Sequence, residues 1–329
     1  MNTRKLGHSG PQVSKIGLGA VAMSDLYGHA RDDAESLATL HAGITLIDTG
    51  DFYGSGHNEM LIGTVIGQRR RDELTISVKF GSRRDPSGGW QPVGVDIGAV
   101  AVKDRLAYTL QRLRTDYVDI YRPTRLNPDI PIEETVGAVA ELVQAGFVRF
   151  IGLSEVGAET LRRAAAVHPI SDLQIEYSLL SRGIEDEILP TARELGMGIT
   201  AYGVLSRGLL SGHWRSRQTT LGDFRAAVPR FQGENLEQNL ALVDALTKVA
   251  EGIGASTAQV AVAWVASRGD DIVPLIGPRQ RQQLTELLGA ADLVLTDQNL
   301  ADIEQAVPLG AAAGDRYPPQ QMSGLDSER

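Results

Sequence analysis

The segment Thr75-Ile76-Ser77-Val78-Lys79-Phe80 is typical of one buried strand, because β-branched and apolar residues dominate a short run. Seven similar runs occur on either side of it, at residues 15–20, 45–48, 117–121, 150–154, 173–176, 198–202 and 272–276. Between them lie segments with helical spacing of apolar residues, such as 136–145 and 241–251. Alternation of strands and helices predicts parallel strands joined by helical crossovers.

Eight strand–helix repeats favour a closed (β/α)8 TIM barrel over an open doubly wound sheet. An open dinucleotide-binding sheet would place a G-x-G-x-x-G turn after its first strand. Here the first run is followed by Gly19-Ala20-Val21-Ala22-Met23, which lacks that pattern. The 329 residues suit one barrel domain over residues 1–329.

Four segments lie outside the repeat. Residues 4–6 and 12–15 flank Gly7-His8-Ser9-Gly10-Pro11 and predict an N-terminal β-hairpin that plugs the barrel. Long loops follow strand 3 (residues 81–94) and strand 7 (residues 203–238), and long loops on a rigid scaffold commonly carry function. The tail, about 309–329, is rich in Gly, Ala and Pro, which predicts partial disorder.

Composition excludes several classes of partner. The net charge of −9 argues against nucleic acid, because a duplex binder normally presents a basic face. The chain has no cysteine, and the lone residues His41 and His57 lack metal-ligand spacing, so we expect no disulfide and no metal site. No apolar run approaches the roughly 18 residues of a membrane span, and the N-terminus lacks a signal-peptide core. We therefore expect a cytoplasmic protein without a membrane partner; a homo-oligomer stays open.

Reactive side chains follow neighbouring strands at the carboxyl end of the predicted barrel, where barrel enzymes place their chemistry. Asp48 ends the second run, Tyr53 follows five residues later, and Lys79 lies near the end of the third. A lysine in an apolar strand needs a polar partner, and Asp48 lies at the same depth. Because a free tyrosine has a pKa of about 10, we expect the Lys79 ammonium to lower the pKa of Tyr53 and so prepare it for proton transfer. Each residue alone is as readily explained by packing or an ordinary ion pair, so the prediction depends on all three together.

The stretches Asp48-Thr49-Gly50-Asp51-Phe52-Tyr53-Gly54, Val78-Lys79-Phe80-Gly81 and Ile151-Gly152-Leu153-Ser154-Glu155 resemble signatures of the aldo-keto reductase superfamily. Ile130-Pro131-Ile132-Glu133-Glu134-Thr135 resembles the bacterial, plant and fungal branch that also contains the potassium-channel β-subunits. The resemblance extends over residues 4–288. It implies an oxidoreductase that uses NADP(H) to reduce aldehydes and ketones reversibly, with a small-molecule carbonyl substrate.

The family's catalytic set of Asp, Tyr, Lys and His carries over as Asp48, Tyr53 and Lys79, but its fourth member differs. Where the family usually has Tyr-Gln-Pro-His-Arg, this chain has Tyr121-Arg122-Pro123-Thr124-Arg125, so Thr124 takes the place of the histidine. A threonine hydroxyl still donates one hydrogen bond, but the loss of an oxyanion-type donor elsewhere costs about 3–4 kcal/mol. The residues therefore leave two functions open, a slower or differently selective reductase and a low-turnover NADP-binding regulatory or sensor protein. A third, a phosphate-handling isomerase or lyase, is disfavoured because it does not require the Asp–Tyr–Lys set.

The resemblance also implies a cofactor site. Ser154 and Gln174 align with the groups that hold the nicotinamide carboxamide, and Tyr202 with the residue that stacks under the ring, although Tyr202 could instead be a packing residue. The loop along the pyrophosphate contains Leu205 and Arg207.

The adenosine-phosphate end of that site falls after the last strand. The matching positions are Gly277, Arg279, Gln283 and Glu286. Arg279 near a helix N-terminus favours NADP over NAD, because a guanidinium there suits a 2′-phosphate. Arg225 or Arg230 is a candidate for a second phosphate clamp. An apolar substrate mouth is expected from Met23, Tyr27, Trp90 and Trp214.

Overall fold

Eight parallel strands close into a barrel in the computed structural model, which describes residues 3–24, 26–28, 31–42, 44–86, 92–214 and 222–329. Around the barrel the strands are β3 (Gly17–Gly19), β4 (Leu46–Gly50), β5 (Thr75–Phe80), β8 (Val118–Pro123), β9 (Val148–Ser154), β10 (Ile170–Glu176), β11 (Gly198–Tyr202) and β12 (Ile272–Ile276). The closed ring, with β12 paired to β3, confirms the predicted (β/α)8 class.

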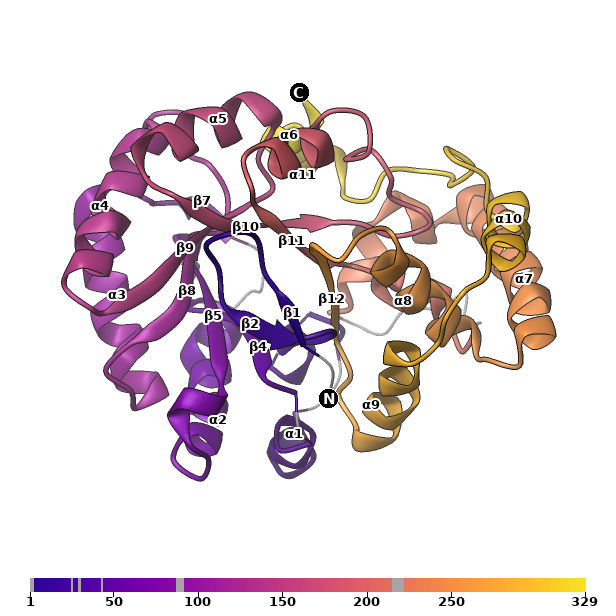
Figure 1. Ribbon diagram of the computed structural model, residues 1–329, viewed down its shortest axis with the longest axis horizontal. Coiled ribbons are helices and arrows are strands. Elements are labelled where there is room, and N and C mark those ends of the chain that lie inside the picture. The colour runs from indigo at the N-terminus through magenta and orange to yellow at the C-terminus, as the bar shows by residue number, and fades with distance from the viewer. Residues whose placement is uncertain (1–2, 25, 29–30, 43, 87–91, 215–221) are drawn as a thin grey trace.

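Helices surround the barrel and bury one face against it (Figure 1). They are α1 (Asp33–Leu40), α2 (His57–Ile66), α3 (Ala99–Leu113), α4 (Ile132–Gln144), α5 (Ala158–Val167), α6 (Ile188–Glu194), α7 (Gly233–Ile253), α8 (Thr257–Ser267), α9 (Arg281–Leu288), α10 (Asp297–Ala306) and α11 (Pro319–Met322). In α3 the buried positions Val102, Leu106, Thr109 and Leu113 recur every three or four residues, which is the spacing of one helical face. Within the described residues, no single helix is long and apolar enough to cross a membrane, although α7 and α8, bent by 86° at their break, pass together by length and composition.

A hairpin of β1 (Thr3–Lys5) and β2 (Gln12–Ser14) covers the amino-terminal end of the barrel, as the sequence predicts. Leu6 and Val13 from this hairpin are fully buried in a cluster with Leu46 and Ile120 of the barrel strands. Gly7 lies so close to the barrel that a Cβ there would be 2.3 Å from the backbone oxygen of Ser171. Only glycine fits, and the plug can therefore seat closely.

The two long loops contain short strands and 3-10 helices that the sequence analysis does not predict. The first long loop contains the hairpin strands β6 (Ser82–Arg84) and β7 (Pro92–Val95), the second of which ends one residue beyond the predicted loop. Residues 203–238 include η4 (Ser206–Ser211), η5 (Phe224–Ala227), η6 (Pro229–Phe231) and the first turns of α7. The remaining 3-10 helices are η1 (Val21–Met23), η2 (Tyr53–Gly56), η3 (Arg71–Glu73), η7 (Gly289–Ala291) and η8 (Asp326–Glu328). Trp90 lies outside the described residues.

The tail packs against the barrel in the structure. In Figure 1 the yellow C-terminal segment runs from α10 across to α11, near α6. Arg316 is only 7% exposed and Leu325 is 2% exposed. The backbone of Gly157, just before α5, donates to Asp326 Oδ2 at 2.8 Å. Ion pairs and hydrogen bonds to the barrel hold the tail in place, and Gly, Ala and Pro content does not report them.

Candidate active site

Tyr53 sits in the sharp connection between β4 and α2, at the start of η2. Two residues of left-handed backbone, Gly54 (φ 57°) and Ser55 (φ 56°), turn the chain directly after it. Asn58 is fully buried and fixes this turn, because its amide donates to Ala20 O at 2.8 Å and accepts from Thr49 Oγ1 at 2.7 Å. The phenol is therefore held by a rigid loop at the mouth of the barrel.

Asp48 and Lys79 form a buried ion pair, as the sequence predicts, with both side chains almost inaccessible to solvent. Two further groups donate to Asp48 Oδ1, namely Ser77 Oγ at 2.9 Å and Gln174 Nε2 at 2.8 Å. The Lys79 ammonium also lies over the ring of Tyr53, 5.2 Å from its centroid. These contacts orient the lysine against both the carboxylate and the tyrosine.

The electrostatics of Tyr53 differ from the expectation. Burial, and then the Asp48 carboxylate, raise the pKa of Tyr53 well above its ordinary value of 10.0, with Arg125 as the chief opposing charge. Lys79 does not dominate, because its ammonium is committed to Asp48 and burial lowers the pKa of Lys79 as well. Tyr53 is therefore a neutral phenol that holds its proton over the whole neutral range.

Thr124 follows β8 and lies beside the same pair. It is 5% exposed, and its backbone N–H donates to Phe80 O at 2.8 Å, which places it next to the end of β5. Its hydroxyl is the short donor expected where the family usually has a histidine imidazole.

One cavity of about 990 Å³ opens at the carboxyl ends of the strands. Apart from Arg230, it brings together every catalytic and cofactor position that the sequence proposes. These are Asp48, Tyr53, Lys79, Thr124, Ser154, Gln174, Tyr202, Leu205, Arg207, Arg225, Gly277, Arg279, Gln283 and Glu286. Tyr27 and Trp214 also line it, whereas Met23 is a core residue that is 3% exposed.

At each end of the proposed cofactor positions, one polar side chain has no partner among the described residues that matches it. Ser154 Oγ is buried and has no hydrogen-bond partner within the described residues. Arg279 precedes α9, and its backbone N–H donates to Gln283 Oε1 at 2.9 Å. No carboxylate of the described residues pairs with the Arg279 guanidinium, while Arg281 nearby is held by Glu35 at 3.0 Å.

The described arginines of the long loop, Arg207, Arg225 and Arg230, are paired with carboxylates of the chain itself. Arg225 pairs with Asp223 at 2.6 Å, and Arg230 is buried, donates to Ser181 Oγ at 2.7 Å and lies 3.7 Å from Glu176. The Arg207 side chain reaches Glu176 at 3.2 Å and covers the ring of Tyr317 at 4.5 Å. Only the backbone of Arg207 therefore remains for a cofactor, and Arg230 is not a phosphate clamp in this arrangement.

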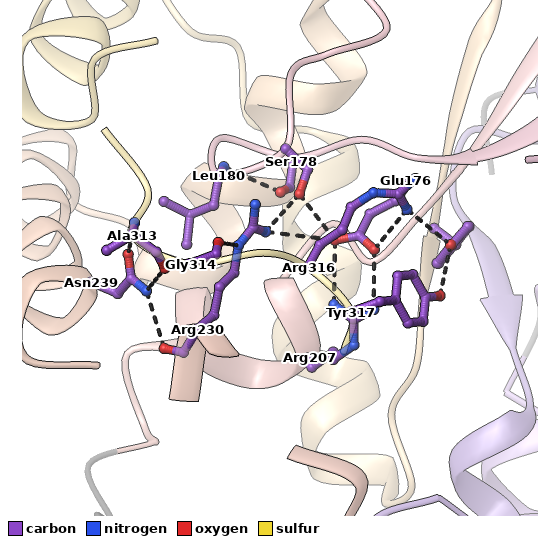
Figure 2. Close-up of polar contacts among 12 residues, drawn as sticks. Glu176, Ser178, Leu180, Arg207, Arg230, Asn239, Ala313, Gly314, Arg316 and Tyr317 are labelled. Carbon is purple, nitrogen blue, oxygen red and sulfur yellow. Dashed lines mark hydrogen bonds and ion pairs between the residues drawn. The ribbon is translucent and has the colours of Figure 1, made fainter. Parts of the chain in front are cut away.

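A polar cluster under the cavity escapes sequence analysis (Figure 2). Two fully buried glutamates, Glu155 and Glu176, bind Arg316 of the tail at 2.6 and 3.3 Å. The tail is also clamped upstream, since Asn239 exchanges two hydrogen bonds with Ala313. Glu155 belongs to the Ile151–Glu155 motif, but the motif does not predict that its partner lies 161 residues further along the chain.

Arg316 places its neighbour Tyr317 in the cavity wall. The Tyr317 hydroxyl lies 2.9 Å from that of Tyr202 and accepts from Arg125 Nη2 at 3.3 Å. Tyr202 in turn donates to Glu155 Oε1 at 2.7 Å. The C-terminal segment is thus part of the site.

The buried Glu155 carboxylate makes the free energy of unfolding depend on pH in the acid range. Burial alone would raise the pKa of Glu155, but the charge and hydrogen bonds of Arg316 outweigh it and lower the pKa from 4.5 to about 2. A lowered pKa stabilises the fold fully above pH 4.5, and that stability is lost as the pH falls towards about 2. The lost contribution is about 3 kcal/mol.

We therefore expect Glu155→Gln to flatten the acid branch of the stability curve by about that amount, as measured by urea unfolding at a series of pH values. Glu133→Gln, at an exposed ion pair on α4, is the matched control. Parallel curves for the Glu155 variant and the wild type would contradict the assignment.

Comparisons with known proteins agree with this geometry. A model of the Aldo/keto reductase family matches residues 15–308, and the chain belongs to that family of oxidoreductases. It is 38% identical over 326 residues to a protein named probable aldo-keto reductase 1 from Glycine max, covering 98% of this chain and 92% of that one.

Two solved structures share the fold. The glycerol dehydrogenase AKR11B4 from Gluconobacter oxydans has a TM-score of 0.85 at 28% identity, with 96% of this chain and 98% of that chain covered. A thermostable aldo-keto reductase, Tm1743, solved with the inhibitor epalrestat, has a TM-score of 0.73 at 27% identity, with 93% and 100% covered.

Proposed function

We propose that this protein reduces an aldehyde or ketone to an alcohol, reversibly and with NADPH, and that Tyr53 donates the proton. The observation that carries the proposal is the meeting of Asp48, Lys79 and Tyr53 at one end of the cavity. A neutral phenol can hydrogen-bond to a carbonyl oxygen and give up its proton as negative charge develops there. Asp48 holds Lys79 beside that phenol, and Thr124 adds a second hydroxyl donor.

The residues present fit a nicotinamide cofactor. Ser154 Oγ is a buried polar atom without a partner in the described chain, and a carboxamide would satisfy it. Arg279 is a cation without a paired carboxylate in that same part of the chain, and it lies at the start of a helix, where a phosphate is favoured. When bound, the cofactor supplies or accepts the hydride. The chain's own residues position the carbonyl and move its proton.

The cofactor preference is tested at Arg279. Arg279→Met is expected to raise the KM for NADPH by roughly 10-fold or more, because a charge-assisted hydrogen bond is lost, and to change the KM for NADH little. The measurement is the initial rate of cofactor oxidation with a panel of aldehydes. Arg281→Met is the matched control, since Arg281 is bound by Glu35. Equal losses with NADPH and NADH would refute a 2′-phosphate role.

A second candidate is a low-turnover NADP-binding regulatory or sensor protein, and Thr124 in the histidine's place favours it. Rapid mixing of the NADPH-bound protein with many carbonyl compounds separates the two functions. Oxidation of the bound cofactor in a single turnover supports the reductase. Tight binding without oxidation supports the sensor.

A further inference from the structure

Arg125, directly after Thr124, is a cation on the cavity wall beside the proposed reaction centre. Arg125 and Tyr53 line the same cavity, and the Arg125 charge lowers the pKa of Tyr53 against burial and Asp48, which raise it. The same charge also reaches Lys79. A bound carbonyl compound at Tyr53 would therefore lie close to a permanent positive charge.

The guanidinium has donors to spare. Arginine carries five N–H donors. Arg125 directs one nitrogen at its neighbour's backbone, Thr124 O, at 2.6 Å and another at Tyr317 Oη at 3.3 Å. Both acceptors are neutral. Its guanidinium also lies over the Tyr317 ring at 5.9 Å, but most of its hydrogen-bonding capacity remains for something else in the cavity.

No carboxylate in the described residues pairs with Arg125. Glu155 acts on it from a distance, but that carboxylate already accepts from Arg316 at 2.6 Å and from Tyr202 at 2.7 Å. Glu176 is shared by Arg207 and Arg316. Figure 2 shows Arg207, Arg230 and Arg316 gathered around Glu176. The cluster under the cavity thus has no spare negative charge for Arg125.

We propose that the carbonyl substrate carries a carboxylate and that Arg125 binds it. A guanidinium matches a carboxylate in charge and in its paired donors, and one cation suits one negative charge. This inference rests on the proposed reductase function and adds the substrate class to it: oxo acids are preferred over neutral carbonyl compounds of the same shape.

The test compares matched substrates, 4-carboxybenzaldehyde with 4-methylbenzaldehyde and 4-oxobutanoate with butanal, in the full-length protein with NADPH. The wild type is expected to favour each carboxylate. Arg125→Met should lower kcat/KM for each carboxylate roughly 10- to 100-fold more than for its neutral partner, mostly through KM. Arg125→Lys should fall between, because it keeps the charge without the paired donors. Arg163→Met, at an exposed ion pair on α5, is the control for loss of an arginine.

Two results would overturn the inference and leave the reductase intact: a wild type that reduces both members of each pair equally, or a loss in Arg125→Met that is equal for charged and neutral aldehydes. Should no carbonyl compound be reduced, the proposed function itself fails. Calorimetric binding of 4-methylbenzoate then still decides the role of Arg125. Weaker binding to Arg125→Met than to the wild type supports it, and equal binding refutes it.

Discussion

Replacement of Tyr53 by phenylalanine is expected to lower kcat/KM for carbonyl reduction by roughly 10²- to 10⁴-fold, the usual contribution of a positioned general acid. The variant keeps the aromatic ring, which contacts Phe52 edge-on at 4.8 Å, and removes only the hydroxyl. Because burial raises the pKa of Tyr53 well above 10.0, the wild-type phenol remains protonated, and the loss should be similar between about pH 6 and pH 9.

The measurement is steady-state NADPH oxidation, with cofactor affinity followed separately by fluorescence titration. Affinity for NADPH should hardly change, since Ser154 and Arg279 are untouched. A phenylalanine variant with the wild-type rate would remove Tyr53 as the proton donor.

The second large effect concerns Arg122, which lies inside the barrel. Arg122 and Asp172 are both fully inaccessible to solvent and pair at 2.9 Å across the barrel interior. Arg122 also donates to Ser77 Oγ, the group that donates to Asp48, and so links the barrel core to the active site. The pair fills the space beside Gly152, where a Cβ would be 2.9 Å from Asp172 Oδ1.

Arg122→Met is expected to lower the free energy of unfolding by about 3–5 kcal/mol, because it leaves the buried Asp172 carboxylate uncompensated. Chemical denaturation measures the change. The double variant Arg122→Met/Asp172→Leu should regain much of the loss, since it removes both charges. It should not regain all of it, because Thr200 Oγ1 then loses the carboxylate to which it donates at 2.7 Å. A single variant as stable as the wild type would contradict the account.

Much of the fold is predictable from sequence because most strands of the barrel are buried along nearly their whole length. β5, β11 and β12 have the predicted limits, since continuous apolar runs end at Gly or polar residues. Asp48 and Lys79 are predictable for the same reason, because both are charges in apolar strands that lie side by side. Lys79 is two residues beyond Ser77, the register partner of Asp48, and its long side chain reaches back to the carboxylate.

What sequence analysis misses are pairings between distant residues. Arg122 is a charged residue in a strand, but its partner Asp172 lies on another strand of the ring, and local spacing does not reveal it. Arg316 is the same case in the tail. The sign of the Tyr53 pKa shift depends on how deeply the phenol is buried, and a sequence does not report depth.

The ion pair between Arg316 and Glu155 also determines when, during synthesis, the cavity can be completed. Residues 316–328 leave the ribosome after every strand of the barrel, yet Arg316 and Ser327 hold Glu155, and Tyr317 forms part of the cavity wall. A nascent chain can close its barrel while this wall is still missing. Until residue 316 has emerged, Glu155 and Glu176 lack Arg316. The binding site is therefore completed only after the tail has been made, later than the scaffold that carries it.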